Sequence, residues 1–169
     1  MAKEVLALYY VKEGVIVVME EQLINFWKVI GEKIRILSDD EKERVWNVVK
    51  ERYLKANVHI GYSICDAINY TIASGIDIAD SWRWISDFVK NDTVILFFNK
   101  DWGNNFYEIE NGSTFVKFYD EECGVIEFYI TDKYASFLIA YNHSQCLVTL
   151  GTAREWLMSD IRYTKRYSV

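Results

Sequence analysis

The stretch "TVILFFN", residues 93–99, opens the part of the chain that decides its fold. Its mixture of β-branched and aromatic residues is typical of a β-strand, and further segments of the same kind follow it. They are "NFYEI" (105–109), "TFVKFYD" (114–120), "VIEFYI" (125–130), "YASFLIAY" (134–141) and "QCLVTL" (145–150). Because the connections are short, residues 92–150 are predicted to form an antiparallel β-meander of about five to six strands.

Turn residues separate these predicted strands. The chain has no proline, so its turns depend on Gly, Asn and Asp. Asn111-Gly112 is a strong hairpin signal between two strands. Gly124 and residues 131–133 and 142–144 mark the other turns.

The chain before the predicted sheet, residues 15–90, has mostly helical patterns. In 17–35 one face of a helix carries Leu23, Phe26, Trp27, Ile30 and Ile34. Ser38 and Glu41 form a capping box that begins a second helix. Helices are also predicted over 62–73 and 77–89, the latter with Trp82 in the core.

The end of the chain predicts one more helix. Thr152 and Glu155 have the spacing of a second capping box, and the helix is expected over about 153–161. The sequence therefore predicts a single α+β domain, residues 1–169, in which N-terminal helices pack on one face of a C-terminal antiparallel sheet.

Composition limits the class of protein. A chain of 169 residues with 51% hydrophobic residues has enough apolar material for one core. No apolar run approaches the 18 or more residues of a membrane span, and the N-terminus lacks the pattern of a secretory signal. Three cysteines make no even disulfide framework. The expected location is the cytoplasm, and no membrane partner is predicted.

The stretch "YNHSQC", residues 141–146, places His143 three positions before Cys146. A Cys–His nucleophile pair needs a third group to orient the histidine, and a zinc site needs three or four ligands. The other candidates, His59, Cys65 and Cys123, are scattered along the chain. We therefore interpret His143 as a turn residue and Cys146 as a core residue, while a zinc site remains an alternative.

Motifs of catalysis and phosphate binding are missing from the sequence. It contains neither the glycine-rich phosphate loop G-x-x-x-x-G-K-[ST] nor the nucleophile elbow G-x-S-x-G. No catalytic residue, cofactor site or metal site is predicted, and the sequence favours a protein that is not an enzyme.

Negative charge is concentrated in one part of the chain. Residues 101–132 carry eight Asp and Glu residues against Lys117 alone, a local net charge of −7, whereas the whole chain has a net charge of −6. Such a face would steer and select a basic partner and would repel nucleic acid. The residues predicted to contact this partner are Glu108, Glu110, Asp120, Glu121 and Glu122, together with Arg83 and Trp84 of "DSWRWISDF". The alternative is a surface that only promotes solubility.

A longer segment, "GVIEFYITDKYASFLIAYNHSQCLVTLGTAREWL" (124–157), resembles the C-terminal sheet of small bacterial immunity-type domains of polymorphic-toxin systems. The shared pattern is G-x-x-E-F-Y-[hydrophobic]-[TS], a strand ending in N-H, and a strand ending in Gly before a helix. The preceding "WRWISDFVKNDTVILFF" resembles the helix and strand before that sheet. Such families often have a second His, where this chain has Ser144.

This resemblance implies a non-enzymatic, cytoplasmic protein that binds a cognate toxin domain and blocks its active site. Many such toxins are nucleases with basic surfaces, which suits an acidic inhibitor. The alternative is a small-molecule-binding domain or minor enzyme, with a pocket between helices and sheet lined by Trp, Tyr and Phe. The oligomeric state is left open.

Overall fold

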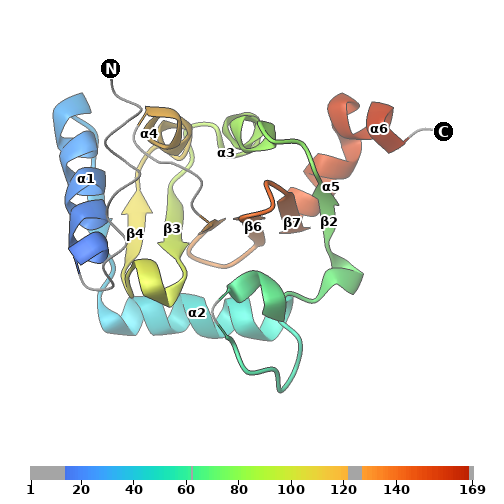
Figure 1. Cartoon of the computed structure of the whole chain (residues 1–169), viewed down its shortest axis with the longest axis horizontal. Helices are drawn as coiled ribbons and strands as arrows, with labels where there is room; N and C mark the ends of the chain where they lie inside the picture. Colours follow the sequence, from blue (N-terminus) through green and yellow to red (C-terminus); the bar gives the residue numbers. More distant parts are fainter. Residues whose placement is uncertain (1–13, 62, 122–126, 168–169) are drawn as a thin grey trace.

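The computed structural model describes residues 14–61, 63–121 and 127–167 of the chain. Within these ranges the protein is α+β, with six α-helices and a seven-stranded antiparallel sheet. Figure 1 shows α2 (Asp39–Tyr53) on one side of the strands and α3 (Ile85–Val89) and α4 (Thr114–Glu121) on the other. The predicted fold class is confirmed. The helices, however, cover both faces of the sheet and are interleaved with the strands.

The sheet has the strand order β1-β4-β3-β5-β6-β7-β2. Its centre consists of β3 (Val94–Phe98), β4 (Phe106–Ile109), β5 (Phe128–Thr131), β6 (Phe137–Tyr141) and β7 (Leu147–Gly151). Only β5, β6 and β7 follow one another as a meander, because β5 pairs with β3 rather than with β4. The edges are β1 (Ile34–Ile36) and β2 (Ser74–Ile76), two short strands that lie within the part predicted to be helical.

One face of the sheet packs against α2. Ser38 and Glu41 form the predicted capping box, with both reciprocal hydrogen bonds present. The buried stripe of α2 consists of Val45, Val49 and Tyr53, spaced three or four residues apart. This stripe covers the side chains of β3, β4 and β5 that point to its side, among them Phe97, Phe106 and Tyr129.

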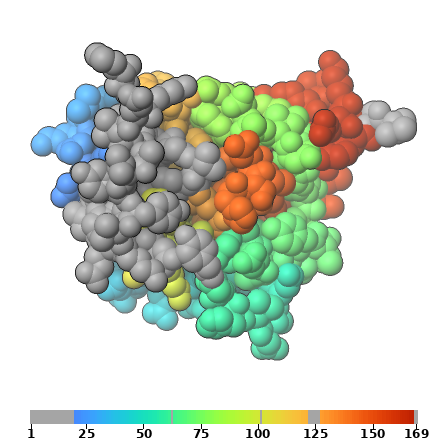
Figure 2. Space-filling model, in the orientation of Figure 1, coloured from blue at the N-terminus to red at the C-terminus, as the bar shows by residue number. Residues whose placement is uncertain are grey.

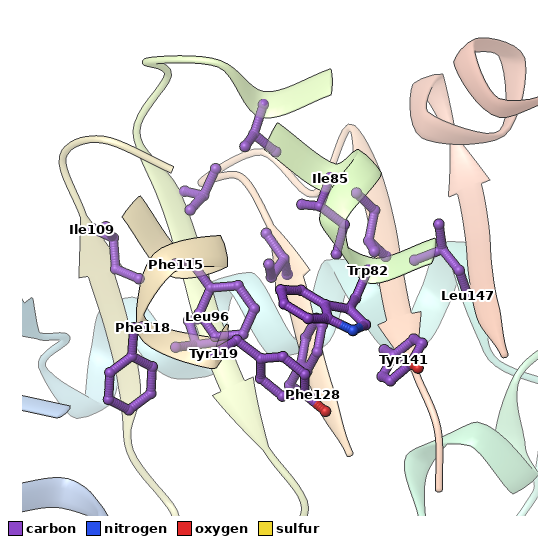
Figure 3. Packing of buried hydrophobic residues seen from close by; sticks show 14 of the residues in the cluster. Trp82, Ile85, Leu96, Ile109, Phe115, Phe118, Tyr119, Phe128, Tyr141 and Leu147 are labelled. Atoms are coloured by element: carbon purple, nitrogen blue, oxygen red, sulfur yellow. The ribbon is translucent and has the colours of Figure 1, made fainter. Parts of the chain in front are cut away.

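The other face is covered by α1 (Gly14–Ile30), α3, α4 and α5 (Thr152–Ser159). Leu23 and Trp27 of α1 and Trp82, as predicted, belong to this core. Figure 3 shows Phe115 and Tyr119 of α4 pointing toward Phe128 of the sheet. Because helices cover both faces, all five side chains of β3 and of β6 are buried. The expectation that helices cover one face only was wrong.

The segment 114–120, predicted as a strand, is the helix α4. Phe115, Phe118 and Tyr119 lie on one side of it, at helical spacing, and are buried. The preceding Gly112 is therefore not a hairpin turn. A Cβ atom there would lie 2.9 Å from Val94 Cγ1 and 3.0 Å from Asp92 O, so glycine lets this turn pack against β3.

Other boundaries also differ from the sequence prediction. In place of a helix over 62–73 there are two short 3-10 helices, η1 (Ile64–Ala67) and η2 (Tyr70–Ile72). The helix predicted over 77–89 begins later, as η3 (Ser81–Trp84) followed by α3. The first helix ends at Ile30, so Ile34 belongs to β1 instead.

The C-terminal region has two helices. The predicted last helix is present as α5, but its second capping box is not, because Gly151 is the N-cap residue and no side chain caps the helix. A further helix, α6 (Ile161–Tyr167), follows in the basic tail. No helix in the described ranges is long and apolar enough to cross a membrane.

Candidate functional site

A cluster of polar side chains lies at one end of the sheet, where β3 ends, β5 begins and β6 ends. Asn99 follows β3, Glu127 precedes β5 and His143 lies in the turn after β6. The three strands are neighbours, with Phe98 opposite Phe128 and Phe128 opposite Tyr141, so these positions meet at one edge. Ser63, the N-cap residue of η1, completes what we call the Glu127 cluster, together with Tyr129 and Cys65.

The carboxylate of Glu127 is the centre of this cluster. The residue is 6% exposed, and its Oε1 atom accepts hydrogen bonds from Ser63 Oγ, Tyr129 OH and Asn99 Nδ2, the last at 2.9 Å. The other oxygen, Oε2, lies 3.3 Å from Nδ1 of His143. The side chain of His143 is 74% exposed. One oxygen therefore faces neutral buried donors, and the other faces an exposed imidazole.

The backbone of η1 is tied into the same cluster. The Cys65 N–H donates to Ser63 Oγ and Tyr129 OH, both at 3.1 Å, and the Ile64 N–H donates to Asn99 Oδ1 at 3.2 Å. Every buried polar group of the cluster thus has a partner, as buried groups require.

These contacts change the acidity of the groups. Desolvation raises the pKa of Glu127, but hydrogen bonds from Ser63, Tyr129 and Asn99 outweigh it, so its pKa lies below the usual range. Burial and then the charge of Glu127 raise the pKa of the Cys65 thiol to about 12. Burial likewise raises the pKa of Tyr129. The cluster therefore holds an ionised carboxylate beside a neutral thiol and a neutral phenol, and Cys65 is not an activated nucleophile.

The turn that carries His143 is built by its neighbour Asn142. The Asn142 side chain accepts hydrogen bonds from the N–H groups of Ser144 and Cys146, both at 3.0 Å. The left-handed residue of the turn is Gln145, with φ 59°, rather than Asn142 or His143. The predicted turn is therefore present, and its outer residue, His143, reaches back to Glu127.

In the described part of the chain, His143 and Cys146 do not belong to a set of residues that could bind zinc. Cys146 is half-buried, and the contact of His143 is with Glu127. Within the ranges that the structure describes, no three His, Cys, Asp or Glu side chains are grouped closely enough to hold a metal ion. Cys123 lies outside those ranges.

The acidic residues predicted to bind a partner do not form one face. Glu108 pairs with Arg35 at 2.8 Å and Glu110 pairs with Lys33 at 3.4 Å, both at the β1 edge. Asp120 lies on α4, which packs against the opposite face of the sheet. It accepts a 3.0 Å hydrogen bond from Arg83.

The remaining predicted contact residues have varied surroundings. Glu121 is exposed at the end of α4, and Glu122 lies outside the described residues. Trp84 is half-buried, and the guanidinium carbon of Arg162 lies 4.5 Å from its ring centre. The structure thus brings Arg83 and Asp120 together, while Trp84 is covered by α6.

A separate pocket lies between α2 and the same end of the sheet, and we call it the α2 pocket. Its volume is about 440 Å³, within the range of small-molecule sites. Its aromatic lining consists of Trp46, Phe97, Phe98 and Phe106, and Lys42, Glu43 and Lys100 are among its polar residues. Phe97 and Phe106 stack with ring centres 4.3 Å apart. Ile64 lines the pocket, and its N–H donates to Asn99 of the Glu127 cluster, so the pocket and the cluster are neighbours.

Comparison of the chain with protein-family models, with curated proteins and with solved structures gave no match.

Sequence reasoning missed Glu127 because it counted this residue among the surface acids. A signal was present: Glu127 directly precedes the hydrophobic run "FYI", where the neighbouring strands are also apolar throughout. A carboxylate at the end of a strand buried on both faces needs partners, and the resemblance pattern E-F-Y and N-H contains three of the residues involved. These are Glu127, Tyr129 and His143.

Proposed function

We propose that this protein is a non-enzymatic binding protein of the immunity type, which binds and neutralises a cognate, basic toxin domain in the cytoplasm. The observation that supports the proposal best is the end of the sheet around Glu127. There an ionised, buried carboxylate lies beneath an exposed histidine, and within the described chain no Lys or Arg forms an ion pair with it.

The surface around this carboxylate has the composition of a protein-binding surface for a basic partner. Tyr70 is 49% exposed, and Asp66, one of the charges that act on it, is exposed as well. Burial, followed by the charges of Cys65, Cys146, Asp66 and Glu127, raises the pKa of Tyr70 to about 12. Figure 2 shows the turn between β6 and β7, in orange, between green segments from residues 60–85. Exposed aromatic groups with acidic neighbours suit a basic protein.

The test is neutralisation of a toxin in cells. Toxin domains encoded beside the gene would be produced in a bacterial host with and without this protein. Growth rescue by the protein, together with a stable complex of the two purified chains, is the expected result. If every such domain kills equally well in the presence of the protein, the proposal is wrong.

The α2 pocket favours a second candidate function, which is binding of a small apolar molecule. Its aromatic lining and its volume are the features of such sites. A ligand seated there would contact Trp46 and change its fluorescence, and the Trp46→Phe variant would lose that change. A metabolite library that produces neither a fluorescence change nor a thermal shift would rule this candidate out.

A further inference from the structure

The two oxygens of Glu127 have unequal surroundings. Oε1 accepts all three hydrogen bonds from Ser63, Tyr129 and Asn99, which fills its acceptor positions. Among the residues that the structure describes, Oε2 has one polar contact, to His143 at 3.3 Å, which is long for a hydrogen bond to a charged group. Oε2 therefore keeps acceptor capacity on the side of the exposed imidazole.

At two other places in this protein, an arginine side chain lies between an aromatic ring and a carboxylate. Arg162 lies over the ring of Trp84 and pairs with Asp87 at 2.7 Å and with Asp160 at 2.6 Å. Arg83 lies 4.4 Å from the ring centre of Trp82 and pairs with Asp120. In both places a flat guanidinium stacks on an aromatic face and donates hydrogen bonds to a carboxylate at its edge.

The end of the sheet has the carboxylate and a ring of such a site, and no arginine in the described part of the chain pairs with that carboxylate. Glu127 supplies the carboxylate, and His143, in contact with its Oε2 atom, supplies an exposed ring. We propose that Glu127 and His143 bind the guanidinium of an arginine side chain that the basic partner inserts at this end of the sheet. This inference rests on the proposed function, because it specifies how the partner is recognised.

The geometry favours arginine over lysine. A guanidinium has several N–H donors in one plane, so it can donate to Oε2 while its face stacks on the imidazole. An ammonium group has no flat face for such stacking. His143 is on a turn and largely exposed, so its ring can move aside or form one wall of the site. The exposed Asp66 would attract the approaching cation.

Argininamide is the probe for this site, and citrullinamide, whose ureido side chain has nearly the same shape as the guanidinium but no charge, is the control. The full chain has only two histidines, so the Cε1–H region of a carbon–proton NMR spectrum contains one signal from His143 and one from His59. Argininamide is expected to shift the His143 signal saturably, whereas citrullinamide is not. The His59 signal, which reports non-specific effects, is expected to stay unchanged. Equal shifts with both compounds, or none with argininamide, would overturn the inference.

Two variants locate the binding on Glu127. Glu127→Gln removes the charge and keeps the shape, and it is expected to weaken argininamide binding at least about tenfold. Glu51→Gln makes the same change on the exposed surface of α2 and is expected to bind like the wild type. Unchanged binding to a folded Glu127→Gln variant would contradict the inference. If that variant does not fold, the argininamide and citrullinamide comparison in the wild type still decides.

The outcome is separable from that of the proposed function. A neutralised toxin together with no response to argininamide would leave the immunity function standing and remove only this mode of recognition. A response to argininamide without any neutralised toxin would leave a guanidinium site in a protein of another function.

Discussion

Glu108 and Glu127 show two ways in which this sheet accommodates a carboxylate. Glu108 lies near the β1 edge, where Arg35 donates to both of its oxygens, at 2.8 and 3.1 Å. Glu127 lies at the end of the central strands, where neutral Ser63, Tyr129 and Asn99 bind one oxygen and His143, alone among the described residues, approaches the other. The carboxylate of Glu108 already has a cationic partner within the protein, so it would gain little from a second one. The carboxylate of Glu127 is stabilised by neutral donors, so it can still form an ion pair with a cation of a binding partner.

Removing the Glu127 side chain should have the largest effect on stability. Glu127→Ala leaves Ser63, Tyr129 and Asn99 without their common acceptor, and we expect a loss of about 3 kcal/mol in the free energy of unfolding. Glu108→Ala, at a half-exposed site, should cost less than about 1 kcal/mol. Urea unfolding of both variants measures the difference. Similar losses of unfolding free energy in both variants would show that Glu127 and Glu108 contribute equally to stability, which would contradict this explanation.

Tyr129→Phe should have an intermediate effect. The hydroxyl donates to Glu127 and accepts from the Cys65 N–H, but Ser63 remains as a second partner for both. We expect a loss of about 1 kcal/mol. The same urea experiment gives the value, and a stability equal to that of the wild type would mean that this hydroxyl is not part of the cluster.

Acid should separate the wild type from Glu127→Gln. The pKa of Glu127 is lower in the folded chain than in the unfolded one, so the unfolded chain binds the proton more readily. The stabilisation is present above the unfolded pKa, about 4.3, and is lost as the pH falls through the folded pKa. We expect the Glu127→Gln variant to lose less stability than the wild type between pH 5 and pH 3, as an order-of-magnitude window. Parallel curves would show that Glu127 does not have a depressed pKa.

Arg35→Gln should have the smallest effect, because its ion pairs with Glu41 and Glu108 are exposed to water. Arg35 also holds the pKa of Glu41 down to about 2, together with hydrogen bonds from Ser38. We expect a small loss of stability that disappears at high salt, since salt screens exposed pairs. Thermal unfolding at low and high salt is the measurement, and a loss unaffected by salt would contradict this explanation.

The sequence predicts the centre of the sheet well and its edges poorly. Runs such as "VILFF" and "FLIAY" are apolar at every position, which marks strands buried on both faces. The edges β1 and β2 have three residues each, too few for a pattern of burial to appear. The segment 114–120 has the composition of a strand, but the spacing of Phe115, Phe118 and Tyr119 is that of a helix, and burial follows the spacing.

The candidate site was less predictable than the fold. Counting charges identified a segment rich in Asp and Glu. It could not show that Arg35, Lys33 and Arg83, from distant segments, form ion pairs with three of these residues. It also could not show that Glu127 is buried and reaches His143 across 16 residues. Both facts depend on strand pairing, which brings together residues whose separation in the sequence gives no signal.

The most direct test of the account is the affinity of the neutralised toxin domain for three forms of the protein: the wild type, Glu127→Gln and Glu108→Gln. The account predicts at least about a tenfold loss of affinity for Glu127→Gln and no change for Glu108→Gln, because Arg35 already pairs with Glu108. An unchanged affinity of Glu127→Gln, with a loss for Glu108→Gln, would place the binding surface at the β1 edge and contradict the account.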